Sequence, residues 1–416
     1  MKHLLLLTDG FPFGGGETFL YSEIDILIDY FTITIVASDT VSPISDDYHW
    51  NLPIHRVSLE FSGFKYMFAT VRALFSRRMW QEIWKIAKGR KLFFRRIKDA
   101  LFVYRKADAL SEYLQKHNLL KGKDLIYCYW HHHAPLGVHL AEKKLNLEIP
   151  IVCRTHGYEL YNERIGGLRQ PFKQYVDHTM TGVFFVSQKG YDYHKASFGF
   201  APTCFYEVAR LGVHKAPVKV TKSTKNTFRI VSVSYLIPLK RVHLIIEALK
   251  LIDSFDIEWI HFGTGVKLKS LQKQAEEMLG GSNHIKYSFK GSVPNSQILR
   301  FYQDEAVDVF ISTSSSEGGC PVSIQEAFAY SIPAIAPAVG GITEMMRDGE
   351  NGLTLSENPS PLEIKEKIEQ IHELKIRGEI TTMKDEAYRT WDSMFRADKN
   401  FLSFTNKLLR ICEANS

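Results

Sequence analysis

The sequence predicts an α/β protein of two doubly wound parallel-sheet domains that face each other across a cleft. Its 416 residues exceed what one hydrophobic core usually organises, so two domains of roughly 200 residues each are expected. Short β-branched or aromatic runs alternate with longer helical patterns, which is typical of βαβ units. The alternation stops once, in the polar and basic stretch 214–227, and then starts again. Ligands of such sheets bind at the carboxyl ends of the strands.

This break sets the expected boundaries. The N-terminal domain covers residues 1–213, an interdomain linker covers 214–227, the C-terminal domain covers 228–395, and a C-terminal helix covers 396–416. Strands are expected at 3–8, 32–37, 124–129, 151–154 and 183–187 in the first domain, and at 228–234, 257–262, 307–311 and 333–336 in the second.

Composition indicates an ordinary globular protein. Apolar residues make up 45% and charged residues 24% of the chain, close to the averages for soluble domains. The five cysteines are widely spread and form no C-x-x-C pair, which argues for a reducing compartment and against a zinc site. The apolar run 4–7 is too short for a signal-peptide core or a membrane span. We therefore expect a cytoplasmic protein.

The segment after the strand at 307–311 has the features of a phosphate site. Gly318 and Gly319 allow a ligand to approach the backbone closely. Pro321 is favoured at the first position of a helix, and the amino end of that helix would offer N–H groups and a partial positive charge to a phosphate. The sequence therefore predicts an anion site at the start of this helix.

The same helix places a carboxylate away from its core face. Ile324 and Phe328, at i and i+4, would face the core, while Glu326 lies about 200° around the helix from Ile324, on one stripe with Ser323 and Tyr330. Carboxylates accept hydrogen bonds from the vicinal hydroxyls of a ribose or a hexose. A nucleotide sugar offers both the phosphates and these hydroxyls.

The stretch EGGCPVSIQEAFAYSIPAIAPAVGGITE at 317–344, with GENGL at 349–353, resembles the signature of glycosyltransferase family 4, of the retaining, group 1 type. The resemblance implies the GT-B fold, with a Rossmann-like acceptor domain, a Rossmann-like nucleotide-sugar donor domain and a C-terminal helix that crosses back to the first domain. By the same resemblance Glu326 binds the nucleotide ribose and Glu317 faces the donor sugar, with Gly318, Gly319 and Ser323 beside the donor. The family usually has seven residues between the two glutamates, whereas this chain has eight, and the seven-spaced position is Gly318.

Two adjacent cations follow the strand at 228–234. A departing nucleoside diphosphate develops negative charge, which a fixed cation stabilises more in the transition state than in the ground state. Lys240 matches the family's catalytic lysine. The family's arginine, five residues earlier, is replaced by Tyr235, so Arg241 is the candidate substitute.

Further loops resemble the family's substrate loops. Gly15 and Gly16, in a glycine run before an amphipathic helix, match the loop that approaches the donor phosphate and the acceptor. His156 matches a residue near the 6-hydroxyl of the donor sugar, with Glu159 where Asp is common. Loops near the nucleotide are matched by Gly263, Gly265 and Phe289, the last of them near the base.

Three consecutive histidines, His131, His132 and His133, suggest a metal site. Consecutive side chains on a strand point to alternate sides, so three adjacent histidines rarely bind one ion. We expect no metal site, and a loop that contacts the acceptor instead.

Residues 61–106 make the protein basic. This aromatic-rich segment has thirteen Lys and Arg against Glu82 and Asp99, a net charge of +11, while the rest of the chain carries −5. Basic amphipathic helices of this kind bind anionic membrane surfaces. Nucleic-acid binding and an ordinary solvated basic face are the rivals, and we favour the membrane over nucleic acid.

These features together predict a retaining, metal-independent hexosyltransferase that needs no cofactor. It would move a sugar from a UDP- or GDP-linked donor to a hydroxyl of a glycan, lipid-linked in our interpretation, at the inner face of a bacterial membrane during surface-polysaccharide or lipopolysaccharide assembly. In this family the leaving phosphate is thought to help deprotonate the acceptor, so no side-chain nucleophile is required. The alternatives are a sugar-nucleotide epimerase of the same architecture and an inactive nucleotide-sugar binder or membrane scaffold.

Overall fold

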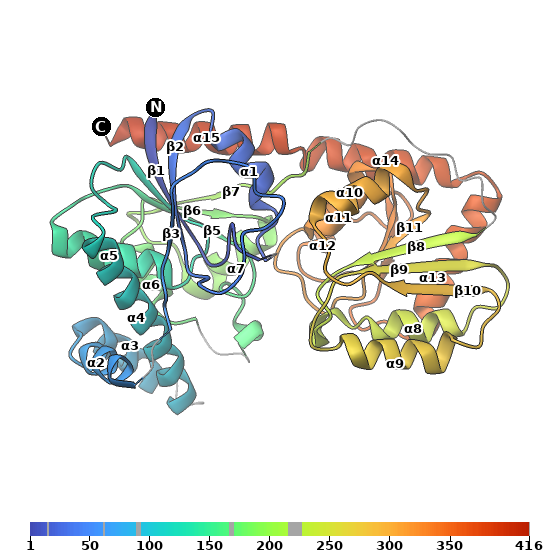
Figure 1. Cartoon of the computed structure of the whole chain (residues 1–416), viewed down its shortest axis with the longest axis horizontal. Helices are drawn as coiled ribbons and strands as arrows, with labels where there is room; N and C mark the ends of the chain where they lie inside the picture. Colours follow the sequence, from blue (N-terminus) through green and yellow to red (C-terminus); the bar gives the residue numbers. More distant parts are fainter. Residues whose placement is uncertain (15, 61–62, 89–92, 166–169, 215–226, 416) are drawn as a thin grey trace. The chain divides into compact units, whose positions relative to one another are not determined.

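The computed structural model describes the whole chain except residues 15, 61–62, 89–92, 166–169, 215–226 and 416. It divides into two compact units. Unit 1 comprises Met1–Ala209 and Phe401–Ser416, and unit 2 comprises Arg210–Asn400. Each unit is a parallel sheet covered by helices (Figure 1), as the alternating sequence pattern predicts. Most of the expected linker lies outside the described residues.

Unit 1 is built on a seven-stranded parallel sheet with the order β3-β2-β1-β4-β5-β6-β7. Its strands are β1 (Lys2–Thr8), β2 (Phe31–Ala37), β3 (Ile54–Arg56), β4 (Leu125–Cys128), β5 (Ile151–Thr155), β6 (Gly182–Phe185) and β7 (Phe205–Val208). The five strands expected from the sequence are present within two residues. The two edge strands, β3 and β7, were missed because they are short, with three and four residues, and none of these residues is buried.

Helices cover both faces of this sheet. They are α1 (Leu20–Leu27), α2 (Gly63–Leu74), α3 (Arg77–Lys88), α4 (Phe93–Lys116), α5 (His133–Leu145), α6 (Lys173–Asp177) and α7 (Gln188–Phe198). One core cluster joins the sheet to α2–α7, and a second joins its other face to α1 and to the last helix, α15 (Ala397–Ala414). Phe404 and Leu408 of α15 are fully buried in this second cluster, so the C-terminus of the chain is part of the core of unit 1.

Unit 2 has a six-stranded parallel sheet with the order β10-β9-β8-β11-β12-β13. Its strands are β8 (Phe228–Val233), β9 (Ile257–Phe262), β10 (Ile285–Phe289), β11 (Val309–Ile311), β12 (Ala334–Pro337) and β13 (Gly352–Leu355). Its helices are α8 (His243–Lys250), α9 (Leu268–Leu279), α10 (Asn295–Asp304), α11 (Val322–Ala329), α12 (Ile342–Met345), α13 (Pro361–Ile376) and α14 (Ile380–Met394). The outer strands β10 and β13 were not expected from the sequence.

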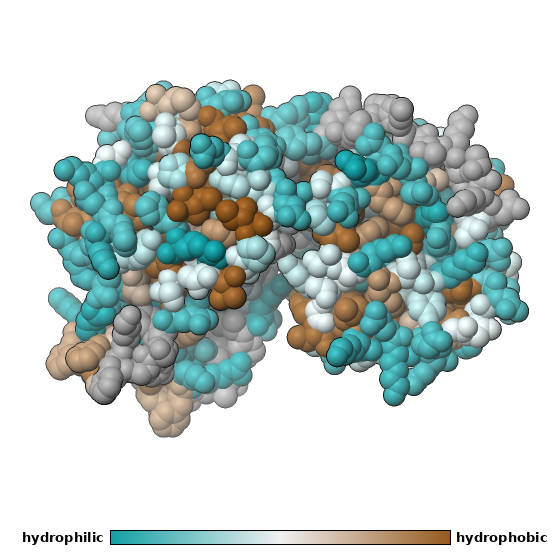
Figure 2. Space-filling model, viewed as in Figure 1, coloured by the Kyte–Doolittle hydropathy of each residue, from teal (hydrophilic) through white to brown (hydrophobic). Residues whose placement is uncertain are grey.

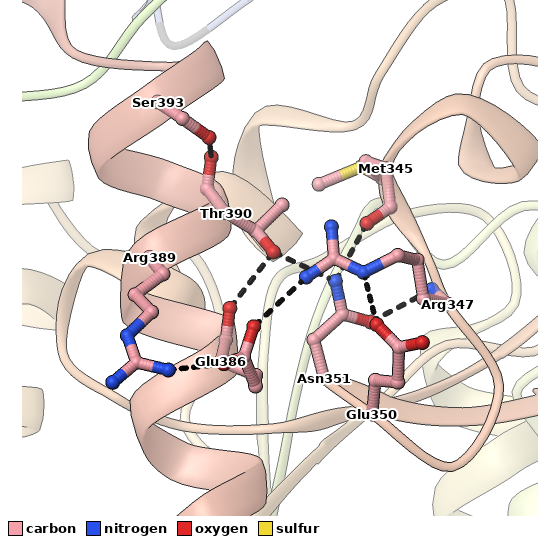
Figure 3. A network of polar contacts seen from close by, with 8 residues as sticks. All are labelled: Met345, Arg347, Glu350, Asn351, Glu386, Arg389, Thr390 and Ser393. Atoms are coloured by element: carbon pink, nitrogen blue, oxygen red, sulfur yellow. Dashed lines mark hydrogen bonds and ion pairs between the residues drawn. The ribbon is translucent and has the colours of Figure 1, made fainter.

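The GENGL segment, 349–353, leads into β13 and is held to α14 by the buried side-chain amide of Asn351 (Figure 3). Asn351 is fully buried, and its amide donates to the carbonyl of Met345 at 2.8 Å and to the hydroxyl of Thr390 at 2.9 Å. It also accepts from the backbone N–H of Arg347 at 2.8 Å. Buried polar groups need such partners because an unpaired one is costly. Asn351 therefore has a structural role within the family-like motif.

Candidate functional site

The candidate donor site of unit 2 lies where the strand order reverses. β8 and β11 are neighbours, and the chain continues from them to opposite sides of the sheet. Ligands of open α/β sheets bind in the crevice that this reversal leaves at the carboxyl ends. The loop after β8 contains Lys240 and Arg241, and the loop after β11 contains Glu317 and leads to α11. The topology therefore brings the predicted residues of both loops to one place.

Lys240 and Glu317 form an ion pair. Lys240 ends a short 3-10 helix, Pro238–Lys240, and its Nζ lies 2.5 Å from Oε1 of Glu317. The two side chains are 21% and 13% exposed, so the pair is partly screened by water and accessible to a ligand. A diphosphate that enters this site would compete with Glu317 for the ammonium group.

Arg241 is occupied by neighbouring loops. It adopts a left-handed backbone conformation, with φ of 47°. Its guanidinium donates to the carbonyls of Thr313 at 2.7 Å, Ser314 at 3.2 Å and Glu357 at 2.9 Å, and to the side chain of Asn358 at 3.0 Å. Arg241 thus joins the loop after β11 to the loop after β13, a role that the sequence did not suggest. Its contact with a diphosphate stays a prediction.

Glu326 is more buried than its place on a polar stripe suggested. Only 6% of it is exposed, and its Oε1 accepts a hydrogen bond from Asn295 at 2.8 Å. Burial raises the pKa of Glu326 to about 7, against the opposing effect of Asn295. Ile324 and Phe328 are fully buried, as expected for the core face. The carboxyl group is therefore close to its titration midpoint at neutral pH.

The start of α11 differs in one respect from the prediction. Pro321 precedes the helix in an extended conformation, with φ of −59° and ψ of 127°, and the helix begins at Val322. Pro321 is thus the capping residue rather than the first helical residue. Its carbonyl accepts from the N–H groups of Ile324 and Gln325, which closes the first turn. Ser323, in this turn, is half-buried.

A glycine pair after β12 supports the loop that contains Glu317, and sequence reasoning did not single it out. A Cβ atom on Gly340 would lie 1.7 Å from the carbonyl oxygen of Glu317, and one on Gly341 would lie 2.2 Å from the carbonyl carbon of Gly319. Gly340 also has a left-handed φ of 52°. Backbone packs directly on backbone here, which only glycine permits. The signal in the sequence was a Gly-Gly pair three residues after the end of a strand.

The predicted glycines after β9 have a similar role. Gly263 and Gly265 have φ of 137° and 157°, and a Cβ atom on them would lie 1.9 Å from the carbonyl oxygen of Ser234 and 2.5 Å from that of Leu236. They therefore bring the loop after β9 against the loop after β8. Phe289, at the end of β10, is half-buried, and its ring centroid lies 5.3 Å from that of Trp259.

In unit 1 the reversal of strand order lies between β1 and β4. Glu17 organises the loop after β1, because its carboxylate accepts from the backbone N–H groups of Gly10 at 2.7 Å and of Phe11, and from the indole of Trp130 after β4. Gly16 in this loop is exposed, and predicted Gly15 lies outside the described residues. The sequence did not indicate this role of Glu17.

His156 follows β5 and is surrounded by aromatic rings. Its ring centroid lies 4.4 Å from Trp130 and 4.8 Å from Tyr129. Glu159 holds its turn by accepting from the backbone N–H groups of His156 at 2.5 Å and Gly157 at 3.1 Å. Burial lowers the pKa of His156. Burial alone would raise the pKa of Glu159, but the hydrogen bonds from His156 and the charge of Lys173 outweigh it and lower that pKa to about 2.

The three consecutive histidines point to different surroundings. β4 ends before them, and His133 is the first residue of α5, so they lie in a turn rather than on a strand. His131 is buried, with Nε2 2.9 Å from Oδ1 of Asp177, while the ring of His132 lies 5.7 Å from that of Tyr158. Across the described residues, no group of three or more His, Cys, Asp or Glu is arranged to hold a metal ion.

The basic segment forms α2, α3 and the start of α4 on unit 1. Large apolar side chains in it are exposed, among them Phe75 at 87%, Phe94 at 85%, Trp84 at 62% and Trp80 at 57%. Figure 2 shows apolar surface among polar surface over the part of unit 1 where α2 and α3 lie. In the described part of the chain, no helix is both long and apolar enough to span a membrane.

Comparison with known proteins gives related sequences for part of the chain. Residues 216–389 match the family model of glycosyl transferases group 1. An uncharacterized glycosyltransferase of Methanocaldococcus jannaschii, MJ1178, is 33% identical over 33% of this chain and 36% of its own. A putative colanic acid biosynthesis glycosyltransferase of Salmonella typhimurium, WcaL, is 24% identical over 36% of this chain and 38% of its own. The matches thus span little more than a third of both curated relatives, and they support the predicted glycosyltransferase class.

Solved structures show the fold over the whole chain. Anabaena Alr3699/HepE in complex with UDP and glucose has a TM-score of 0.70 at 18% identity, covering 99% of this chain and 100% of its own. Sucrose-phosphate synthase from Thermosynechococcus elongatus has a TM-score of 0.71 at 13% identity and covers 100% of both chains. The lipopolysaccharide outer core galactosyltransferase WaaB has a TM-score of 0.63 at 17% identity, over 98% and 99%. The predicted GT-B fold is confirmed.

The close contact at Gly340 gives a stability prediction. Gly340→Ala combines a left-handed φ with a Cβ that overlaps the Glu317 carbonyl, so it should lower the free energy of unfolding by about 2–4 kcal/mol. Gly349→Ala is the matched control, because its φ is 78° but a Cβ would meet no atom within 4 Å, and it should cost only about 1–2 kcal/mol. Urea unfolding followed by tryptophan fluorescence measures both. Equal losses would contradict the proposed packing.

Proposed function

We propose that the protein is a retaining, metal-independent hexosyltransferase of glycosyltransferase family 4, which moves a sugar from a nucleoside diphosphate donor to a hydroxyl of a glycan. The observation that carries this proposal is the Lys240–Glu317 ion pair at the β8/β11 reversal, in a unit that contains the match to glycosyl transferases group 1. No cofactor is required for this reaction.

Lys240 would act on the leaving group. In the free protein its ammonium group is paired with Glu317. As the glycosidic bond breaks, charge develops on the diphosphate, and a cation fixed there lowers the barrier because it binds the transition state more strongly than the ground state. The carboxylate of Glu317, released from Lys240, would then accept hydrogen bonds from hydroxyls of the donor sugar.

The comparisons guide the choice of donor and acceptor. Structures of HepE contain UDP with glucose, or UDP-glucose, so UDP-glucose is the first donor to test, followed by GDP-linked sugars. The relatives WcaL and WaaB are named for colanic acid biosynthesis and for the lipopolysaccharide outer core. Their names support a role in bacterial surface-polysaccharide assembly. A lipid-linked glycan as the acceptor is our proposal.

We also propose that the protein works in the cytoplasm at the inner face of the membrane. The exposed aromatic side chains of α2–α4 lie within the segment that has a net charge of +11. Aromatic side chains favour the bilayer interface, and each Lys or Arg near an anionic surface contributes on the order of 1 kcal/mol. The same segment would thus hold unit 1 close to a lipid-linked acceptor.

Substitution of the lysine tests the reaction. Lys240→Met should lower kcat with UDP-glucose, or with whichever donor of the panel turns over, by about 100-fold or more, because the developing diphosphate charge loses its cation. Lys273→Met is the control, since this lysine is 78% exposed and pairs with Glu277 on its own helix. Release of nucleoside diphosphate and mass spectrometry of the product measure transfer. Unchanged turnover in Lys240→Met would overturn the site assignment.

Product analysis of the same reactions separates the alternatives. An epimerase would convert the donor to an isomeric nucleotide sugar without an acceptor. An inactive binder would bind the donor and show no product with any member of the panel.

The raised pKa of Glu326 predicts that donor binding depends on pH. Ribose hydroxyls donate to the ionised carboxylate, so binding lowers the pKa from about 7 and releases a proton. The donor affinity should therefore fall as the pH falls, by about tenfold between pH 8 and pH 6. Calorimetry in buffers of different ionisation enthalpy measures the affinity and the proton release. Glu326→Gln should bind more weakly at high pH and lose this dependence, and a wild-type affinity that is constant with pH would contradict the assignment.

Vesicle binding tests the membrane proposal. The double variant Trp80→Ser and Trp84→Ser should bind phosphatidylcholine–phosphatidylglycerol vesicles about tenfold or more weakly than the wild type, because two exposed rings lose their apolar contact with the bilayer. Val266→Ser, at an exposed position of unit 2, is the control. Cosedimentation measures the affinity. Binding that is equal in all three proteins, or salt-sensitive binding to nucleic acid instead, would overturn the proposal.

A further inference from the structure

Glu326 has more capacity to accept hydrogen bonds than the described residues around it use. Its side chain is 6% exposed, and the side-chain hydrogen bond described for it comes from the amide of Asn295 to Oε1, at 2.8 Å. An ionised carboxylate can accept about four hydrogen bonds, and a buried charge is costly unless such bonds are formed. The group is therefore suited to a ligand that donates hydroxyl groups to its other oxygen, Oε2.

Asn295 reaches Glu326 from a neighbouring helix. It is the first residue of α10, whereas Glu326 lies on α11, 31 residues further along the chain. Ile298 and Tyr302 of α10 and Ile324 of α11 belong to the same buried core cluster. The packing of the two helices thus sets the position of the amide relative to the carboxylate.

The partner of Glu326 is a neutral amide, while the other carboxylate of the donor site, Glu317, is paired with the cation of Lys240. A cation at Glu326 would neutralise the carboxylate and compete with hydroxyl donors of a ligand. An amide N–H donates one hydrogen bond and leaves the negative charge in place. Since a hydrogen bond to an ionised acceptor is roughly twice as strong as one between neutral groups, Asn295 favours the ionised form.

Among the described residues, the titratable side chains that interact with Glu326 are two phenols, Tyr302 of α10 and Tyr330 directly after α11. Burial, and after it the charge of Glu326, raise the pKa of both, that of Tyr330 to about 12. Asp304 acts on Tyr330 in the same direction. Both phenols are therefore neutral at physiological pH. The pKa of Glu326 itself is raised by burial and lowered by the hydrogen bond from Asn295.

We propose that Asn295 is a positioning residue for the nucleotide, which holds Oε1 of Glu326 and leaves Oε2 to accept from the ribose hydroxyls. Without this hydrogen bond, burial would act on the carboxyl group unopposed, and the group would be mostly protonated at neutral pH. A protonated carboxyl presents an O–H donor where the ribose offers donors of its own. The inference rests on the proposed function for the assignment of Glu326 to the ribose, but the contact between Asn295 and Glu326 does not.

Removal of the amide tests this role. Asn295→Leu keeps a similar volume without a donor, and Asn295→Ala removes the same group without the bulk of leucine. Asn295→Gln keeps an amide and should recover part of the wild-type behaviour. Gln297→Leu, at an exposed position of the same helix, is the matched control.

Two measurements on the full chain are needed. Carbon-13 NMR of labelled glutamate follows the titration of Glu326 in the absence of any ligand, with Glu326→Gln to assign its signal. Calorimetry between pH 6 and pH 9 gives the affinity for UDP, or for GDP if UDP does not bind.

Asn295→Leu and Asn295→Ala should move the midpoint of the Glu326 titration upwards by about one pH unit. The nucleotide should then bind about fivefold more weakly than to the wild type at pH 7, but within about twofold of it at pH 9, where the carboxyl group is ionised in all these proteins. Gln297→Leu should match the wild type at every pH.

A Glu326 titration that is unchanged in Asn295→Leu and Asn295→Ala would overturn the proposal, and so would a loss of affinity of the same size at every pH, which a purely structural role predicts. A titration that moves while the nucleotide affinity stays constant would refute the ribose contact and the proposal with it. The expected pH-dependent loss, in a protein that transfers no sugar from any donor, would support the role of Asn295 and refute the proposed transfer. A wild type that binds neither nucleotide would overturn both.

Discussion

The parallel pairing of β8 with β11 is the constraint on which the candidate donor site depends. The register sets Val309 beside Ile230 and Phe310 beside Val231, and it brings the loops that follow the two strands together. The hydroxyl of Thr313 then donates to the carbonyl of Lys240 at 2.9 Å, and Arg241 donates back to the carbonyl of Thr313 at 2.7 Å. A loss of this pairing would separate the lysine from its carboxylate. The same reversal between β1 and β4 gathers the loops of unit 1.

Much of this arrangement was predictable from the sequence, because it depends on local patterns. Buried strands with dense β-branched residues were located within two residues, and the helix with Ile324 and Phe328 on its core face was correctly oriented. The residues that support the loops were not predictable. The contact of Gly340 with the carbonyl of Glu317, and the hydrogen bond from Asn295 to Glu326, join residues whose proximity is fixed only by strand order. The role of Arg241 in joining two loops was not predictable either, because its carbonyl partners on other loops leave no trace in its local sequence.

A buried ion pair in unit 1 could not be predicted from the sequence either, because its two residues lie 131 positions apart in the chain. Glu23 of α1 and Arg154 of β5 are fully buried and form an ion pair of 2.6 Å, and the cation also lies 4.1 Å from the ring centroid of Phe404 in α15. Removing either partner would leave an uncompensated charge in the core, which is strongly destabilising. Arg154 lies in β5, two residues before His156, which directly follows the strand. The pair therefore ties the C-terminal helix of the chain to the strand that presents His156.

The three sides of helix α3 lie in three different environments. At about 100° per residue, Met79 and Ile86 fall on one side, and both are buried in the core of unit 1. Trp80 and Trp84 fall on one flank and are more than half exposed. Arg78 and Lys85 fall on the other flank, where Arg78 lies 5.0 Å from the ring centroid of Tyr175 in α6. A solvated basic helix would need only the core side to be apolar, with polar residues elsewhere. Two exposed tryptophans on one flank are unfavourable in water. A helix that only covers the core of a soluble domain would carry polar residues at these positions. Contact of this flank with the apolar interior of a membrane explains why the tryptophans are there.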